Sequence, residues 1–306
     1  MTGTEEKKKD ISAAALIARV WQGLGRNYSF DMAAELGFYF LYSLFPFFIF
    51  MVAIMAYSPV ASNPEKILAL VREFLPDYLF TMAGPTLLDL IFTPRKLLAI
   101  GTLALALWSA SSAVSSLMAA LNRIHCVQER RSYWRTTGVA IMLTAGLVGV
   151  LLTAVFLLIT GPLLRNWIVV QVGFPHLLGY LFLALRWGVW VTVQLVVLAM
   201  LFSFGPDIHR PFKLLSHGAF ITIIGQFVFS EIFSIYIQNA GSYNLFYGAA
   251  GGIIGLMTWL YMMGLMILIG AQVNHELGEY HAASVSSEER DHTCRYRRPK
   301  KKRTTV

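Results

Sequence analysis

The amino-acid sequence predicts an all-α protein that crosses a membrane several times, and three observations support this class. Hydrophobic residues make up 56% of the 306-residue chain and charged residues only 14%, against about 25% in soluble domains. The apolar residues gather in continuous runs of about 20 residues or more, the length that a helix needs to cross hydrocarbon. Such runs exclude a membrane β-barrel, whose strands are about 10 residues of alternating polarity.

Six segments have the length and composition of membrane spans. They run at about 35–57, 97–122, 137–160, 178–204, 213–238 and 248–273. Each is expected to be helical, because backbone groups in hydrocarbon must bond internally. The transmembrane domain is therefore predicted over residues 11–283, between a charged tail at 1–10 and a basic, disordered tail at 284–306.

The distribution of Lys and Arg predicts the orientation of the spans. With the N-terminus inside, nineteen of the 25 basic residues fall on the cytoplasmic side and five on the outer side, while Arg186 lies within a span. Short cytoplasmic loops carry this excess of positive charge in membrane proteins. Both termini are therefore predicted to be cytoplasmic.

Two further segments are amphipathic but too short to span. In the first, residues 11–26, one helical face carries Leu16, Ile17, Val20, Trp21 and Leu24. This pattern is typical of a helix that lies in the membrane interface. In the second, the outer connection at 58–96, we expect one or two amphipathic helices that act as a lid or only as a cap.

Two charged residues fall inside predicted spans. Arg186 and Glu231 both lie about 10–13 Å below the outer surface, at 1.5 Å per residue. Charged groups are costly in hydrocarbon and usually face protein or water. We expect the two side chains to form an ion pair or to share a small hydrated cavity. A purely structural pair, a binding site for a substrate or ion, and separate snorkelling to the surface all remain open at this point.

Other polar residues lie near the inner ends of the spans. Glu35, Asn122 and Arg123 are predicted to approach one another at an inner mouth. Gln272 and Asn274 lie in the last span and are expected mainly to join helices, as polar groups in membranes do.

Proline and glycine mark special positions in two spans. Pro46 lies near the middle of the first span and is predicted to kink it, with Ser43 compensating for the backbone group that is freed. The last span carries overlapping small-residue pairs at Gly248, Gly251, Gly252 and Gly255. These pairs favour close helix packing, and a hinge or a dimer face are the alternatives.

The sequence offers no catalytic, metal-binding or cofactor-binding motif. The seven His residues form no HExxH or comparable spacing, and no Walker A or GxSxG sequence occurs. The basic C-terminal tail is expected to attract anionic lipid. Nucleic-acid binding is disfavoured, since no aromatic residue interrupts the terminal basic run.

Several short motifs occur together in a fixed order along the chain. They are Leu36-Gly37-Phe38-Tyr39, Ser43-Leu44-Phe45-Pro46, Trp108-Ser109-Ala110-Ser111-Ser112, Leu121-Asn122, Phe204-Gly205-Pro206-Asp207, Tyr247-Gly248, Trp259-Leu260-Tyr261 and the run from Leu268 to Asn274. In order and spacing they resemble the YihY/BrkB family over about residues 20–280.

The resemblance implies a multi-pass protein of the bacterial inner membrane with six helices and both termini inside. Members were formerly labelled ribonuclease BN, a label that the residues here do not support, and some are linked to serum resistance. The family often carries an acid in the last span where this chain has Gln272. The acid Glu276 lies one turn later.

These features predict a transporter- or flippase-like envelope protein that moves a lipid, an envelope precursor or a small anion. The alternative is a non-transporting membrane scaffold for envelope proteins. Membrane lipids are the expected partners, with envelope proteins and a second copy of the chain as further candidates.

The predicted orientation is tested by fusing reporters to the two ends of the chain. A fluorescent protein that matures only in the cytoplasm is expected to give signal at either end, because both ends carry cytoplasmic positive charge. Alkaline phosphatase, which is active only outside, is expected to give signal at neither. Signals from opposite sides of the membrane would contradict the predicted topology.

Overall fold

The computed structural model describes residues 12–55, 89, 95–150, 153, 175–208, 212–239 and 241–285, and all secondary structure in them is helical. The labelled helices are α1 (Ala13–Arg26), α2 (Ser29–Met55), α5 (Lys96–Ile124), α7 (Pro175–Phe204), α8 (His217–Asn239) and α9 (Gly241–Val285). A further helix covers residues 133–150. The predicted all-α class is therefore confirmed for this part of the chain.

Five of the helices are long and apolar enough to cross a membrane. The candidate spans are Ser29–Phe50, Lys96–Ile124, Ala184–Phe204, His217–Gln238 and Gly251–Gly278. They coincide with five of the six predicted spans. The remaining one, predicted at 137–160, begins in the helix at 133–150, and most of its later residues lie outside the described part. The expected outer helices at 58–96 and most of both tails also lie outside it.

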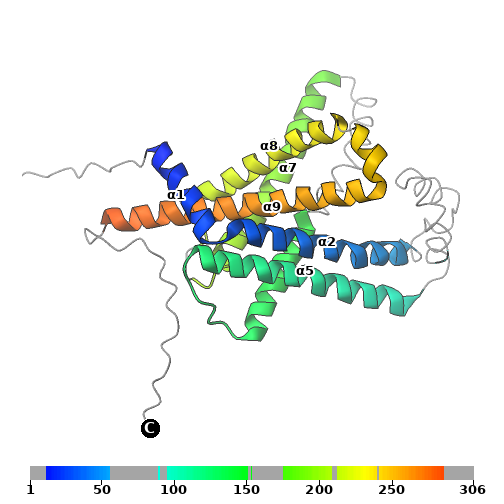
Figure 1. The fold of residues 1–306 in the computed structure, drawn as a ribbon, viewed down its shortest axis with the longest axis horizontal. Helices are drawn as coiled ribbons and strands as arrows, with labels where there is room; N and C mark the ends of the chain where they lie inside the picture. Colours follow the sequence, from blue (N-terminus) through cyan, green and yellow to red (C-terminus); the bar gives the residue numbers. More distant parts are fainter. Residues whose placement is uncertain are drawn as a thin grey trace, which may run out of the picture.

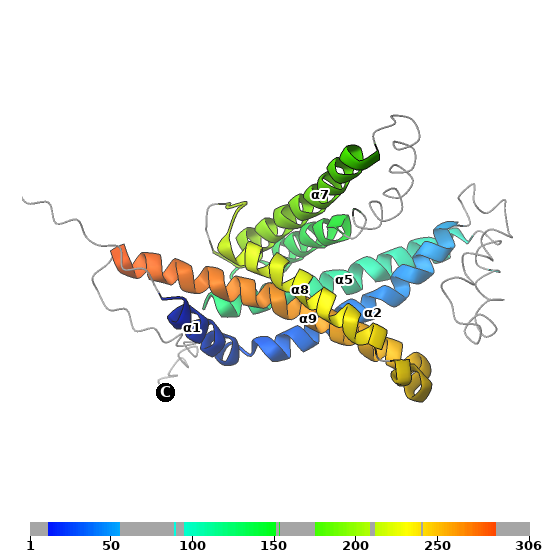
Figure 2. The ribbon, with the colours of Figure 1, turned by 90° about the horizontal axis from the view of Figure 1, so that it is seen from above.

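The helices converge at one end of the bundle and diverge toward the other (Figure 2). We call the converging end the α1 end, because α1 lies there together with the C-terminal part of α9 (Figure 1). The connection at 125–132 and the described residues 205–208 and 212–216 also lie at the α1 end. The beginnings of α5 and α9 lie at the opposite end. Both termini of the described chain are thus at the same end of the bundle.

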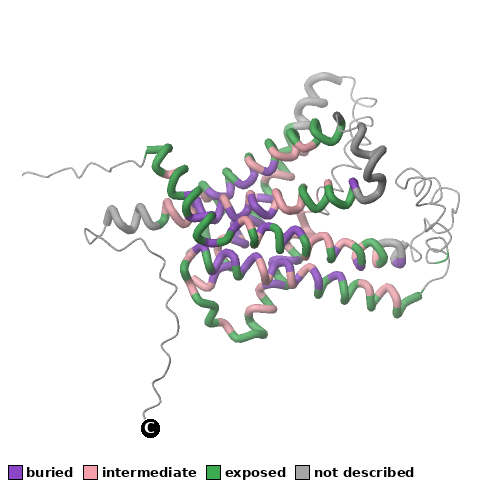
Figure 3. Tube along the Cα trace, viewed as in Figure 1, coloured by how far each residue is buried: buried purple, intermediate pink, exposed green. Residues whose placement is uncertain are grey.

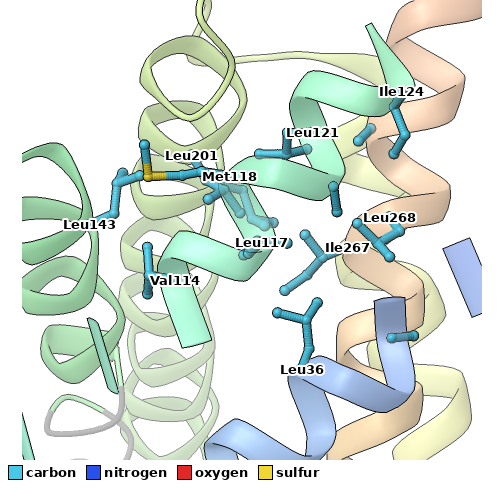
Figure 4. Packing of buried hydrophobic residues seen from close by; sticks show 14 of the residues in the cluster. Leu36, Val114, Leu117, Met118, Leu121, Ile124, Leu143, Leu201, Ile267 and Leu268 are labelled. Atoms are coloured by element: carbon cyan, nitrogen blue, oxygen red, sulfur yellow. The ribbon is translucent and has the colours of Figure 1, made fainter. Parts of the chain in front are cut away.

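The apolar core occupies the α1 end (Figure 3). Leu117, Met118 and Leu121 of α5 lie at its centre and are at most 1% exposed. Leu36 of α2 and Leu268 of α9 meet them from neighbouring helices (Figure 4). Toward the opposite end, residues 95–105 of α5 and 227–238 of α8 include no buried residue. The packing is therefore densest at the α1 end, with a few buried residues such as Ala53 of α2 toward the opposite end.

Helix α9 continues far beyond the thickness of a membrane. Its 45 residues have a contour length of about 68 Å at 1.5 Å per residue, against about 30 Å of hydrocarbon, and the first turns bend away from the rest of the helix (Figure 1). Helix α1 packs on the C-terminal part of α9. Val20 and Leu24 of α1 form a buried cluster with Val273 of α9, with Leu277 packed against it.

The predicted interfacial face of α1 is thereby divided. Leu24 is 2% exposed, whereas Ile17 and Trp21 remain 69% and 67% exposed. Only these last two side chains are available to lipid, because α9 covers their neighbours. A position at the membrane interface stays a prediction for this remaining face.

The closest approach between α8 and α9 is at two glycines. A Cβ atom added at Gly218 would collide with the carbonyl oxygen of Gly270, and one at Gly270 would collide with Thr222. Thr222 Oγ1 donates a hydrogen bond across the same contact to the Met266 carbonyl at 3.2 Å. Small residues allow this backbone contact, as in other membrane helix pairs.

The close packing predicted for the last span is not centred on its N-terminal glycines. Gly252 has nothing within 4 Å of an added Cβ, and Gly255 makes only ordinary contacts, the nearest at 3.7 Å. Gly251 is buried, and the side-chain surroundings of Gly248 lie outside the described residues. The helices diverge in this region, which explains the space around Gly252.

Helix α2 runs unbroken through Pro46. Ser43 Oγ donates to the Phe40 carbonyl at 2.8 Å. Pro46 has no N–H group, so the carbonyl of residue 42 loses its usual donor. Ser43 does not bond this carbonyl. Its hydroxyl bonds the carbonyl of Phe40 instead.

We expect Gly270→Leu to destabilise the protein strongly, since the added side chain has no space between α8 and α9. Overpacking of this kind costs about 1–3 kcal/mol. The measurement is the melting temperature of the protein in detergent. Gly252→Leu is the matched control in the same helix and should leave the melting temperature nearly unchanged. Equal losses in the two variants would contradict the close contact.

Candidate functional site

Four polar residues at the α1 end form a cluster that joins α5 to the end of α7. We call this set, Asn122, Glu129, Arg131 and Asp207, the α5–α7 cluster. Asn122 is 5% exposed. Its Nδ2 donates to Glu129 Oε2 at 2.9 Å, and its Oδ1 accepts from the Asp207 backbone N–H at 2.7 Å. One buried amide therefore holds two segments that are distant in sequence.

Arg131 closes the cluster from the other side. Its Nε and Nη2 donate to the two carboxylate oxygens of Glu129, each at 2.7 Å. Its Nη1 and Nη2 also donate to the carbonyls of Phe204 and Gly205, at 3.0 and 2.8 Å. These carbonyls lie at the end of α7, where helices leave acceptors unsatisfied and favour positive charge.

The charges within the cluster stabilise one another. The hydrogen bond from Arg131 is the main reason that the pKa of the Glu129 carboxyl is lowered, although burial acts in the opposite direction and Asn122 adds to the lowering. The same bond raises the pKa of Arg131, with burial again opposing it. Both groups are therefore ionised at neutral pH, and the ion pair persists.

The predicted contact at the inner mouth is not formed as expected. Glu35 Oε1 accepts a hydrogen bond from Ser116 at 2.7 Å, and the Arg123 guanidinium lies 5.7 Å from the centre of the Tyr28 ring. Arg123 follows Asn122 directly, so it points about 100° away around the helix. Asn122 joins the α5–α7 cluster instead.

Sequence reasoning missed Glu129 and Arg131, and it treated Asp207 only as part of a motif. Glu129 and Arg131 sit in a charged connection that looks like an ordinary solvated loop. One residue could have indicated the cluster from the sequence. The charged Asp207 follows Gly205-Pro206 directly after a span, where its carboxylate lies close to a helix end. In the structure this motif meets the Leu121-Asn122 motif.

The polar residues of the last span join helices at the α1 end, as predicted. Gln272 is 1% exposed, accepts from Asn27 Nδ2 at 2.9 Å and donates to Glu276 Oε1 at 2.9 Å. Asn274 Oδ1 accepts from the Gly218 backbone N–H at 2.8 Å. These bonds tie the end of α1 and the start of α8 to α9.

Arg186 and Glu231 lie toward the opposite end of the bundle. Arg186 is half-buried on α7, and Glu231 is exposed on α8. The ion pairs among the described residues do not include these two side chains. The geometry thus does not pair them, and a shared hydrated cavity stays a prediction.

A pair of buried amides lies between α7, α8 and α9. Gln194 Nε2 donates to Gln226 Oε1, and Gln226 Nε2 donates to the Met263 carbonyl at 3.4 Å. Gln194 Oε1 is buried and has no hydrogen-bond partner among the residues that the structure describes. Such an acceptor costs free energy when it is left unsatisfied.

Within the part of the chain that the structure describes, no three His, Cys, Asp or Glu side chains gather as metal ligands would. Polar chemistry here lies in the α5–α7 cluster, in the amide pair and at Arg186.

These helices and their apolar faces define a multi-pass membrane protein. The profile of the family described as virulence factor BrkB matches residues 20–293. The chain therefore belongs to the BrkB family, to which the UPF0761 (YihY) membrane proteins among its relatives are similar. No solved structure matches it.

Several curated sequences are similar to this chain. The ribonuclease-like protein YfkH of Bacillus subtilis is 33% identical over 243 residues, which cover 79% of this chain and 87% of YfkH. The UPF0761 membrane protein of Vibrio parahaemolyticus is 28% identical over 264 residues, covering 81% and 77%. YihY of Shigella boydii is 32% identical over 92 residues, covering 30% and 32%.

The α5–α7 cluster predicts a pH-dependent contribution to stability. Because the pKa of Glu129 is lowered in the folded protein, its ion pair stabilises the fold above about pH 5, beyond the ordinary glutamate range. That contribution is lost as the pH falls through the lowered pKa. Glu129→Gln should therefore lower the melting temperature at pH 7, and the difference from wild type should shrink toward pH 3.

The control for this measurement is Asp31→Asn, which changes an exposed acid in the first turn of α2. Its effect on the melting temperature should depend much less on pH. A Glu129→Gln difference that stays constant from pH 7 to pH 3 would show that the ion pair does not stabilise the fold.

Proposed function

We propose that this chain is a transporter- or flippase-like protein of the bacterial inner membrane, which moves a lipid, an envelope precursor or a small anion. The observation that carries the proposal is Arg186. It lies in the apolar span Ala184–Phe204, is half-buried, and is absent from the ion pairs of the described residues. A charge in hydrocarbon needs water or an anionic group nearby.

The uneven packing of the bundle supports the same proposal. The α1 end is held by the apolar core and by the α5–α7 cluster. Toward the opposite end α7, the helix that carries Arg186, separates from α9, whereas α2 and α5 stay side by side (Figures 1 and 2). A bundle that is closed at one end and separated at the other has the arrangement that alternating access requires at one stage.

The charges support the α1 end as the cytoplasmic side. Arg19 on α1, Arg123 at the end of α5, and Arg130 and Arg135 beyond it are all exposed. Such an excess of arginine is typical of cytoplasmic segments. In this orientation, Arg186 is in the half of the membrane that faces outward.

The competing proposal is a scaffold that binds envelope proteins without moving a solute. Ribonuclease chemistry is the interpretation that we favour least. The word ribonuclease-like describes YfkH, and the polar residues described above suggest no hydrolytic arrangement.

The test is reconstitution in liposomes with labelled lipid in one leaflet, and in parallel with a labelled small anion inside. We expect the protein to accelerate movement of one of these solutes over empty liposomes. Arg186→Ala should slow it about 10- to 100-fold, since a hydrogen bond to a charged group is worth about 1.5–3 kcal/mol. Arg186→Lys should retain part of the rate.

The matched control is Arg135→Ala, which removes an exposed arginine outside the spans and should leave the rate unchanged. Rates equal to those of empty liposomes for every solute would remove the transport proposal and favour the scaffold. Equal losses in Arg186→Ala and Arg135→Ala would remove Arg186 from the site.

A further inference from the structure

We propose that the face of α7 around Arg186 and Gln194 binds a hydroxylated phosphate ester, the chemistry of a polyol headgroup on an anionic lipid. Arg186 binds the phosphate, and Gln194 Oε1 accepts a hydrogen bond from a headgroup hydroxyl. We call these residues, with Trp187 of α7 and Phe227 of α8, the α7–α8 site. The inference rests on the proposed function and names the class of ligand at the same arginine.

The first argument is that these α7 residues share one face. At about 100° per residue, Gln194 lies about 80° around the helix from Arg186. Trp190 falls between them, at about 40° from Arg186, and Trp187 lies just outside this sector, at about 100°. Trp187 contacts Phe227 across the helix pair at 6.0 Å, and Gln194 bonds Gln226. Both contacts reach adjacent residues of α8, Gln226 and Phe227, so the two helices meet beside this face of α7.

The second argument is the unsatisfied acceptor. Gln194 is 9% exposed, and Oε1 is the part of its amide that no donor reaches. An acceptor that has no partner in a span calls for a donor from a ligand, because water is scarce in hydrocarbon. A hydroxyl group supplies that donor, whereas a bare phosphate diester has none.

The third argument is the surface beside the amide. Trp187 and Phe227 are 48% and 46% exposed, and their rings meet edge to face. Aromatic rings with one apolar surface and a polar neighbour are suited to groups that carry both C–H and O–H bonds. A polyol has this character.

The fourth argument is length. The Cα atoms of Arg186 and Gln194 are separated by eight residues, or about 12 Å along the axis of α7. A small inorganic anion is too short to contact both side chains. A phosphate that carries a three-carbon polyol fits the distance once each side chain extends toward the ligand. The spacing thus selects a polyol phosphate among the solutes proposed above.

The experiment compares phosphatidylglycerol with phosphatidylethanol, which carries the same single negative charge and lacks headgroup hydroxyls. Binding is measured from the rise in melting temperature of the detergent-purified full chain as lipid is added. Wild type is expected to bind phosphatidylglycerol about fivefold more tightly, the effect of one net hydrogen bond. Glycerol phosphate forms a third arm, which distinguishes a free phosphate ester from a lipid.

The variants assign the preference to the named side chains. Gln194→Leu should bind both lipids equally, and Arg186→Ala should bind both more weakly. The matched control is Gln238→Leu, which changes an exposed amide that bonds only within α8 to Ser234 and should keep the preference. If Gln194→Leu does not fold, the comparison of lipids in wild type still decides the proposal.

Equal affinity of wild type for the two lipids would overturn the α7–α8 site, as would a preference that survives in Gln194→Leu. This failure is separate from failure of the proposed function. If the protein moves lipid in liposomes but shows no headgroup preference, the transport proposal is supported and the α7–α8 site is contradicted. Headgroup preference without movement of any solute keeps the site and removes transport.

Discussion

Close backbone contact between helices is the interaction on which this structure depends. In hydrocarbon, burial of apolar side chains gives little driving force for association, because lipid tails are as apolar as leucine. Helices must therefore gain dispersion contacts and hydrogen bonds at short range. Gly218 and Gly270 allow this between α8 and α9, and Thr222 adds a hydrogen bond across the same contact. The apolar core around Leu117 forms only where such approach is possible.

The same constraint explains why the two ends of the bundle differ. At the α1 end, buried amides and an ion pair satisfy the polar groups where the spans end, so segments distant in sequence are fixed together. Asn122 and Arg131 are the centre of this arrangement, since each contacts both the loop after α5 and the end of α7. Toward the opposite end the described ion pair, Arg95–Asp89, is exposed and joins residues only six positions apart, and α7 separates from α9 (Figure 2). This contrast between the two ends is the basis of the proposed access of a solute to Arg186.

Some parts of the candidate site were predictable and others were not. Arg186 stood out because any charge inside an apolar run is conspicuous. Gln272 and Asn274 were correctly predicted to join helices, since amides in spans seldom have other partners. Arg123 was expected to contact Glu35, but the neighbouring Asn122 is the residue that faces another helix. Neighbouring residues on a helix point about 100° apart. Which of the two faces another helix depends on how the helices pack, and the periodicity of the sequence does not determine this.

The sequence by itself determined the solvent of this protein. Continuous apolar runs and the scarcity of charge require helices in hydrocarbon, and they placed five spans that the structure contains. Tertiary structure alone decided which faces of those helices meet. In the structure α1 packs on the C-terminal part of α9. The tight glycine contact is at Gly218 and Gly270. Gln194 Oε1 has no donor among the described residues. The physical reason is that composition sets the cost of exposing a group to lipid, whereas partners depend on distances between helices that are remote along the chain.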